Sequence, residues 1–266
     1  MSSEVRFAGG VFKEIHVELN GADVDTSLLK KEEHSEELWS FAGKVWQQRL
    51  ETEYRSVQIM VRLLDDMMGA GDPIDTFSGV ADMITDEIHH VGLCASMVRG
   101  LGATPMLPNP VALEAPEAYL KQPRMQRALS TALAMLAVNE TISEGYITDL
   151  HTRCKHPVVH EVLDRTLGDE ETHNAFGWTY IEKSIQRFPD EIMTGLRSLV
   201  EQSIRPHKTH AEEIIARLSF NERSLSAWPD HDHISLGLFT VERQALVYQQ
   251  TYEEILAPKL KKLNLL

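Results

Sequence analysis

The sequence predicts an all-α protein built on four long helices. Apolar residues recur at helical spacing over long stretches, and turns that contain glycine or proline separate these stretches. A proline-rich segment at residues 102–123 divides the four helices into two pairs, and about two more helices follow toward the C-terminal end. No repeat of solenoid length is present, which argues against a helical repeat protein.

The first 34 residues differ from the rest of the chain. Apolar and polar side chains alternate at residues 4–7 and 13–19, and Asn20 with Gly21 is a turn signal. This pattern favours a short hairpin or an arm. We therefore expect an arm or hairpin at residues 1–34 and a single helical domain at 35–266, with its core at 35–187 and accessory helices at 188–266.

The first pair of helices is marked by apolar residues spaced three and four apart. The first helix runs from about Ser35 to Met68, and the sequence Gly-Ala-Gly-Asp-Pro then ends it. The second begins after Pro73 and ends at a turn over residues 100–102. The proline-rich segment that follows is the longest connection, and we expect one helical turn in it, at Pro116.

The second pair and the accessory helices follow the same signals. A third helix spans about residues 124–153, and Lys-His-Pro separates it from a fourth at about 158–187. A fifth covers about residues 190–218, residues 219–233 form a loop, and a last helix begins at Val241 and leads to Pro258.

Composition restricts the class of protein. The 26 basic and 40 acidic residues give a formal charge of −14, which argues against nucleic acid or an anionic membrane as partner. Two cysteines, Cys94 and Cys154, make neither a disulfide framework nor a Cys-x-x-Cys motif, as expected in a reducing cytoplasm. No signal peptide and no apolar stretch long enough to span a bilayer is seen, so we expect a soluble cytoplasmic protein.

Two Glu-x-x-His motifs are the main candidates for metal binding. A glutamate with a histidine three residues later occurs only twice, at Glu87 with His90 and at Glu170 with His173, in both cases within a predicted helix. This spacing places a carboxylate and an imidazole on one helix face, where both can bind one metal ion. Each motif also follows an aspartate, Asp86 or Asp169, which could accept a hydrogen bond from the ligand imidazole.

A carboxylate-bridged two-metal site needs two more glutamates from two further helices. Glu53 lies in the middle of the first predicted helix, 34 residues before Glu87, and Glu140 lies in the third, 30 residues before Glu170. About thirty residues are enough for a helix to turn and return to the same height. Glu51 and Glu144 are alternatives, and Glu144, one turn from Glu140, could line the same pocket together with Tyr146.

Other assignments remain open. Each Glu-x-x-His motif alone could be an exposed polar pair, and Glu53 and Glu140 could be surface residues. His89 competes with His90, because Asp86 lies three residues before it. The remaining histidines are interpreted as surface or structural groups, with a possible adventitious metal site at 231–233: His151, His156, His160, His207, His210, His231 and His233. Tyr146 and Trp178 are either core aromatics or lie at the pocket.

The paired motifs resemble the ferritin-like di-iron carboxylate superfamily, and the pattern covers about residues 53–173. Residues 139–178 are similar to a group of bacterial ferritin-like proteins and, more loosely, to N-oxygenases of the aminobenzoate type. The resemblance implies a ferritin-like four-helix bundle with one long crossover. It also implies six catalytic metal ligands, Glu53, Glu87, His90, Glu140, Glu170 and His173, with Asp86 and Asp169 behind the histidines. The N-oxygenases carry a further histidine ligand where this chain has Thr166, which argues against amine oxygenation.

The expected activity is that of a non-haem di-iron oxidoreductase. Four carboxylates and two imidazoles suit two Fe2+/Fe3+ ions, with manganese also possible, and leave room for O2. We expect oxidation of a small organic substrate by an oxygenase or oxidase. Since no Gly-x-Gly-x-x-Gly fingerprint is present, a separate reductase or ferredoxin-like donor must supply electrons. The alternatives are a ferroxidase or peroxide-scavenging protein and a metal-free helical binding protein. A homodimer is the expected oligomer.

Overall fold

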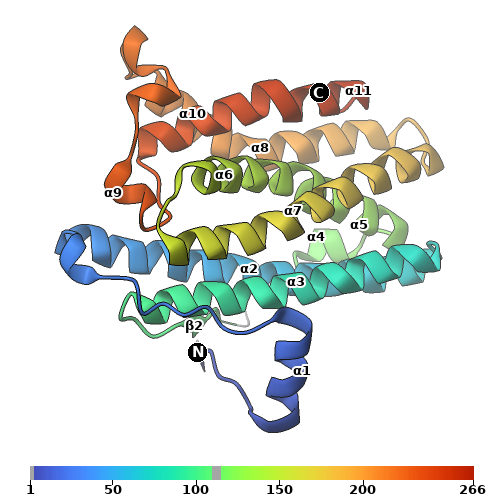
Figure 1. The fold of residues 1–266 in the computed structure, drawn as a ribbon. Coiled ribbons are helices and arrows are strands. Elements are labelled where there is room, and N and C mark those ends of the chain that lie inside the picture. The colour runs from blue at the N-terminus through green and yellow to red at the C-terminus, as the bar shows by residue number, and fades with distance from the viewer. Residues whose placement is uncertain (1–2, 110–114) are drawn as a thin grey trace. The chain divides into compact units, whose positions relative to one another are not determined.

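A computed structural model describes residues 3–109 and 115–266 and shows an all-α protein (Figure 1). The described strands are two residues long each: β1 (Ser3–Glu4) and β2 (Met106–Leu107), which pair antiparallel with Ser3 opposite Leu107. Residues 110–114 of the predicted proline-rich connection lie outside the described residues. No helix in the described part of the chain is both long enough and apolar enough to cross a membrane.

The chain forms two compact units. Unit 1 comprises Met1–Arg127 and His156–Val162, and unit 2 comprises Ala128–Lys155 and Leu163–Leu266. Two helices, α5 and α7, begin in unit 1 and continue into unit 2.

Unit 1 is built on a long antiparallel helix pair, α2 (Glu36–Ala70) and α3 (Ile74–Gly100), as the sequence predicts (Figure 1). The side chain of Ser35 caps α2 by accepting a hydrogen bond from the backbone N–H of Leu38. Gly71 ends α2 in the left-handed conformation, with φ 73°. Trp46, Leu50, Met60, Leu63, Val80, Met83 and Met97 contribute to the buried core of this pair.

The N-terminal segment contains a helix where the sequence suggested a strand. Residues 13–19 lie in α1 (Gly10–Asn20), so the prediction of a hairpin strand there is wrong. The alternation concealed a second pattern, since Val11, Ile15 and Leu19 are spaced four apart, which is helical spacing. All three are exposed. A short 3-10 turn, η1 (Lys31–Glu33), precedes α2.

The proline-rich connection also belongs to unit 1. It contains β2 and the helical turn α4 (Glu117–Leu120), which follows Pro116 as predicted. Asp66 of α2 is buried, and its carboxylate accepts hydrogen bonds from the Tyr119 hydroxyl, at 3.1 Å, and from the Arg127 guanidinium. These bonds hold the end of the connection against α2.

The predicted third helix is a continuous run of three segments. It consists of α5 (Arg124–Thr131), the π-helical η3 (Ala132–Asn139) and α6 (Glu140–Arg153). The predicted fourth helix is α7 (Pro157–Ser184), followed by the 3-10 turn η4 (Ile185–Arg187). In unit 2, Gly177 of α7 lies so close to η3 that a Cβ atom there would be 2.6 Å from the Leu136 backbone.

The C-terminal part of unit 2 contains the predicted accessory helices. They are α8 (Ile192–Ile215), α10 (Val241–Thr251), a second π-helical segment η7 (Tyr252–Leu256), and α11 (Ala257–Lys262). Between α8 and α10 the chain forms two 3-10 turns, η5 (Phe220–Glu222) and η6 (Leu225–Ala227), and the short helix α9 (His231–Ile234). α10 packs against α8 and α6.

Candidate metal centre

Unit 1 brings three of the predicted ligands together. Glu53 lies in the middle of α2, and Glu87 and His90 lie on one face of α3. Glu87 and His90 are each only 1% exposed. The Nδ1 atom of His90 lies 3.8 Å from Oε2 of Glu53 and 3.8 Å from Oε2 of Glu87. Two carboxylates therefore converge on one imidazole nitrogen inside this unit.

Unit 2 holds a matching set. Glu140 begins α6, and Glu170 and His173 lie on α7. Their exposed fractions are 6%, 3% and 0%. His173 Nδ1 lies 3.9 Å from Oε2 of Glu170, and Glu140 offers a carboxylate oxygen within 4.8 Å of a ring nitrogen of His173. We call the two sets the unit 1 triad (Glu53, Glu87, His90) and the unit 2 triad (Glu140, Glu170, His173).

The geometry of each triad fits metal binding. Separations of 3.8–3.9 Å are longer than hydrogen bonds, in which nitrogen and oxygen lie about 2.7–3.2 Å apart. They suit two atoms bound to one ion, because two metal–ligand bonds of about 2.1 Å span at most about 4.2 Å. Burial of carboxylates is costly unless they are paired or bind a metal ion. Imidazole nitrogen and carboxylate oxygen are donors that iron, manganese and zinc accept.

The backbone is irregular where it reaches Glu140. The π-helical segment η3 ends at Asn139, so Glu140 is the first residue of regular α-helix. A π-helix adds a residue to each turn and changes the direction of the side chains that follow, and such segments occur frequently at functional sites. The apolar sequence Ala-Leu-Ala-Met-Leu-Ala-Val gives no sign of this change of pitch.

A hydrogen-bond network fixes the residues next to the unit 2 triad. Thr141, beside Glu140, donates to the Ala137 carbonyl at 2.6 Å and accepts from the indole Nε1 of Trp178 at 3.1 Å. Asn174, beside His173, donates to the carboxylate of Glu144 and lies 3.3 Å from the Thr141 hydroxyl. The network joins α6 to α7 and so limits how far the two ligand-bearing helices can shift.

The alternatives from the sequence are placed as follows. Glu51 is partly exposed and accepts a hydrogen bond from Gln47, whereas the unit 1 triad contains Glu53. His89 is half-buried, whereas His90 is buried. Glu144 belongs to the Asn174 network rather than to the triad. Asp86 and Asp169 are both half-buried beside the ligand glutamates, and their support of the histidines stays a prediction.

Two residues beside the unit 1 triad were missed in the sequence. Arg49 lies one turn before Glu53, and Cys94 lies one turn after His90. Burial lowers the pKa of Arg49, although the charge of Glu53 acts in the opposite direction, and the guanidinium stays protonated at neutral pH. Burial and the charge of Glu53 raise the pKa of the Cys94 thiol well above its usual value, so it remains a neutral thiol. Their spacing of four residues from Glu53 and His90, which places them on the same helix faces, could have identified them in the sequence.

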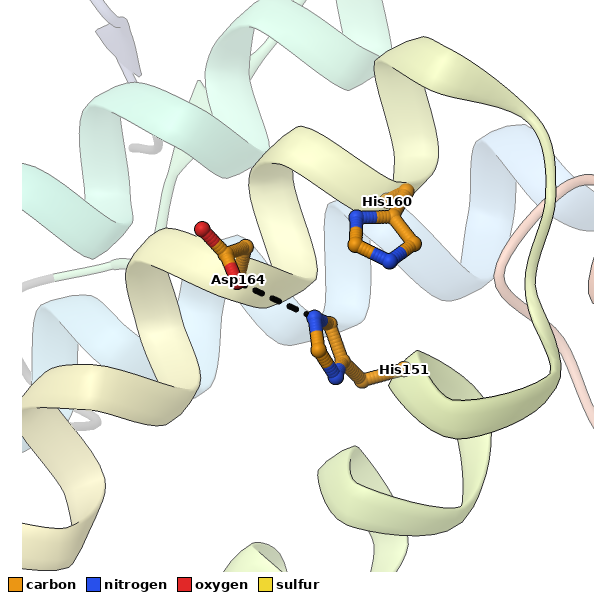
Figure 2. Close-up of side chains that lie close together, drawn as sticks. All are labelled: His151, His160 and Asp164. Atoms are coloured by element: carbon orange, nitrogen blue, oxygen red, sulfur yellow. Dashed lines mark hydrogen bonds and ion pairs between the residues drawn. The ribbon is translucent and has the colours of Figure 1, made fainter.

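The other histidines lie in more polar surroundings. Figure 2 shows His151 of α6, whose Nε2 lies 3.1 Å from Oδ1 of Asp164 on α7, and His160 one turn before Asp164 on the same helix. The Asp164 side chain is 68% exposed. His151 and His160 are themselves half-buried, so their interpretation as surface groups stays a prediction. His207 is half-buried, and it lines a cleft described below together with His210.

Comparisons of the chain with models of known families, with characterised proteins and with solved structures found no match.

Proposed function

We propose that the chain is a non-haem di-iron oxidoreductase with a ferritin-like four-helix core, in which the six triad residues hold two metal ions. The activity is oxidation of a small organic substrate with O2, and an external reductase or ferredoxin-like donor supplies the electrons. One observation carries the proposal: each unit buries a Glu-x-x-His pair, and a further glutamate lies beside it, half-buried at Glu53 and buried at Glu140. Nitrogen and oxygen atoms lie 3.8–3.9 Å apart within these sets.

Iron is the metal that best suits this donor set and this activity. The ligands offered are four carboxylates and two imidazoles, an oxygen-rich set that accepts both Fe(II) and Fe(III). When bound, the iron pair would supply the redox chemistry with dioxygen, and manganese could occupy the same ligands. No wholly thiolate or wholly histidine set of three residues occurs among the described groups of possible ligands, so a structural zinc site of those types is not the favoured alternative.

The protein itself holds the ligand side chains in place and excludes water from them. The five buried ligands keep bulk water away from the triads, which strengthens electrostatic interactions with any bound cation. The Thr141–Trp178 and Asn174–Glu144 bonds hold α6 and α7 in fixed register beside Glu140 and His173. Both triad histidines present Nδ1 to the carboxylates, so Nε2 is the nitrogen left for a supporting acceptor.

Metal content per chain is the decisive measurement. Protein expressed with supplementary iron should contain about two iron ions per chain, as measured by mass spectrometry. Replacement Glu170→Ala should lower that number to about one or fewer, because a buried ligand is lost. The adjacent Glu171→Ala, at an exposed position of the same helix, should leave it unchanged. On α2, Glu53→Gln should likewise lower the metal content, and its control Glu51→Gln should leave it unchanged.

The oxidase step is tested separately on the loaded protein. Anaerobic loading with Fe(II), followed by a pulse of O2, should produce rapid oxygen consumption that Glu170→Ala lacks. A wild-type protein that binds no metal, or the same metal content in Glu170→Ala and Glu171→Ala, would overturn the metal centre. Metal binding without oxygen consumption would overturn the oxidoreductase and leave a metal-binding protein.

A further inference from the structure

Unit 2 contains a cleft away from the triad residues, between α6, α8 and α10. One part, of about 190 Å3, is lined by Tyr146, His207, His210 and Gln244. A second part, of about 440 Å3, lies between α8 and the end of α10 and includes Lys208, Arg223 and Tyr252. Ala211 and Tyr248 line both parts, so the two parts adjoin at these side chains. The smaller part has room for a molecule of one ring.

The Tyr248 hydroxyl is the unusual group in this cleft. Tyr248 is only 3% exposed, and its hydroxyl has no hydrogen-bond partner among the described residues. Nearly all buried hydroxyl groups in proteins are hydrogen-bonded, and a buried donor without an acceptor destabilises the fold. Burial raises the pKa of this phenol, with smaller effects from Tyr252, Tyr146 and Glu212, so the group is a neutral donor at physiological pH. Because Tyr248 lines both parts of the cleft, an acceptor atom of a bound molecule that reaches this hydroxyl would satisfy it.

Two aromatic rings stack on the ring of Tyr248. The ring of Tyr248 stacks on His207, with centroids 5.8 Å apart, and on Tyr252, with centroids 6.1 Å apart; both interplanar angles are 18°. Burial, followed by the charge of His210, lowers the pKa of His207, so this imidazole is neutral at pH 7. All three side chains of this row line the cleft, so they offer aromatic surface to a flat molecule.

The helices that form the cleft are irregular at this place. Pro206, which lines the smaller part, lies inside α8 and cannot donate a helical hydrogen bond. Tyr252 begins the π-helical segment η7. π-helical segments such as η7 occur frequently at functional sites.

We propose that this cleft binds a small planar organic molecule, whose ring lies against the row His207–Tyr248–Tyr252 and whose carbonyl-type oxygen accepts a hydrogen bond from the Tyr248 hydroxyl. As the substrate site of the oxidoreductase it rests on the proposed function. Tyr146, which lines the smaller part, lies six residues after Glu140 on α6, a rise of about 9 Å along the helix.

The test uses two probe molecules that differ only in whether they carry a hydrogen-bond acceptor, a ketone oxygen. We would titrate the full-length protein with 4-fluoroacetophenone and, separately, with 4-fluoroethylbenzene, and follow binding by 19F NMR. The ketone should bind with a Kd on the order of 1 mM, as expected for so small a ligand. The hydrocarbon should bind about fivefold more weakly, the equivalent of one neutral hydrogen bond.

Tyr248→Phe removes the hydroxyl and keeps the ring. In this variant the two probes should bind equally, and the unfolding midpoint should stay the same or rise, because an unsatisfied donor is removed. Tyr119→Phe is the matched control. It lies in unit 1, where its hydroxyl donates to Asp66, so the probes should keep their fivefold difference while the unfolding midpoint falls.

Two results would overturn the proposal. One is equal affinity of the two probes, or no saturable binding, in the wild-type protein. The other is a fivefold preference for the ketone that persists in Tyr248→Phe. Because binding is measured without turnover, failure here leaves the metal measurement untouched, and absence of metal leaves the binding result standing.

Discussion

Trp178 and Thr141 are joined by a hydrogen bond of 3.1 Å from the indole Nε1 to the hydroxyl oxygen, and both side chains are buried. The bond links α7 to α6 one residue after Glu140. The same hydroxyl donates to the Ala137 carbonyl in the π-helical segment η3. Thr141, which directly follows the proposed ligand Glu140, therefore connects the π-helical segment to the neighbouring helix α7.

Thr141→Val should lower the free energy of unfolding by about 1–3 kcal/mol, because the isosteric side chain leaves the buried indole N–H without its acceptor. Urea unfolding measures the change. Thr152→Val is the control on the same helix: Thr152 also donates to the carbonyl four residues earlier but is exposed, and it should change stability by less than about 0.5 kcal/mol. Equal effects of the two substitutions would contradict the role of the Trp178 bond.

Gly177 allows α7 to approach the π-helical segment. Gly177→Ala should destabilise unit 2 by about 1–3 kcal/mol, because the new Cβ would lie 2.6 Å from backbone and side-chain atoms of Leu136. Gly168→Ala, at an open and exposed position of the same helix, should instead stabilise by up to about 1 kcal/mol through helix propensity. Thermal unfolding of both variants checks the prediction, which fails if they shift in the same direction.

Asp66 holds the end of the proline-rich connection in unit 1. Its carboxylate is buried and bonded to Arg127, whose side chain is also largely shielded. Asp66→Ala should cost about 2–3 kcal/mol, since it leaves the half-buried guanidinium without its carboxylate partner. The neighbouring pair Asp65–Arg124 is exposed, so Asp65→Ala should cost at most about 1 kcal/mol. Chemical unfolding of the two variants makes the comparison, and similar losses would refute the buried pair.

The sequence predicted the long helices well because their signals are local. Apolar spacing located α2, α3, α7 and α8, and their ends coincide with a serine cap at Ser35, a left-handed Gly71 and a proline at Pro73. The Glu-x-x-His pattern likewise identified residues that the structure buries in pairs, because three residues of helix fix their common face.

The features that the sequence did not predict depend on contacts that no local sequence pattern encodes. Residues 132–139 are nearly all apolar, so their spacing could not distinguish a π-helix from an α-helix. In α1 the alternation at residues 13–19 fitted a strand as well as a helix. The cleft combines Tyr146 with Tyr248, which are about a hundred residues apart in the chain, and each alone is an ordinary aromatic residue.

Asp149 should make the stability of unit 2 dependent on acid pH. Its carboxylate accepts hydrogen bonds from Arg243, at 2.6 and 2.9 Å, and from Arg153, at 2.6 and 3.0 Å. Burial alone would raise its pKa, but the two guanidinium groups outweigh burial and hold the pKa below the usual 3.8. Because the folded state favours the charged form, this stabilisation is complete above about pH 5 and is lost as pH falls below 3.8.

Asp149→Asn should therefore be less stable than the wild type by about 3 kcal/mol at pH 7, and the difference should shrink as pH falls below 3.8. Urea unfolding of both proteins at several pH values from 7 to 3 measures this difference, and groups common to both cancel. Glu201→Gln, which removes an exposed partner of Arg205, should differ from the wild type by less than about 0.5 kcal/mol throughout. A constant difference between Asp149→Asn and the wild type across this range would mean that the charge of Asp149 does not stabilise the fold.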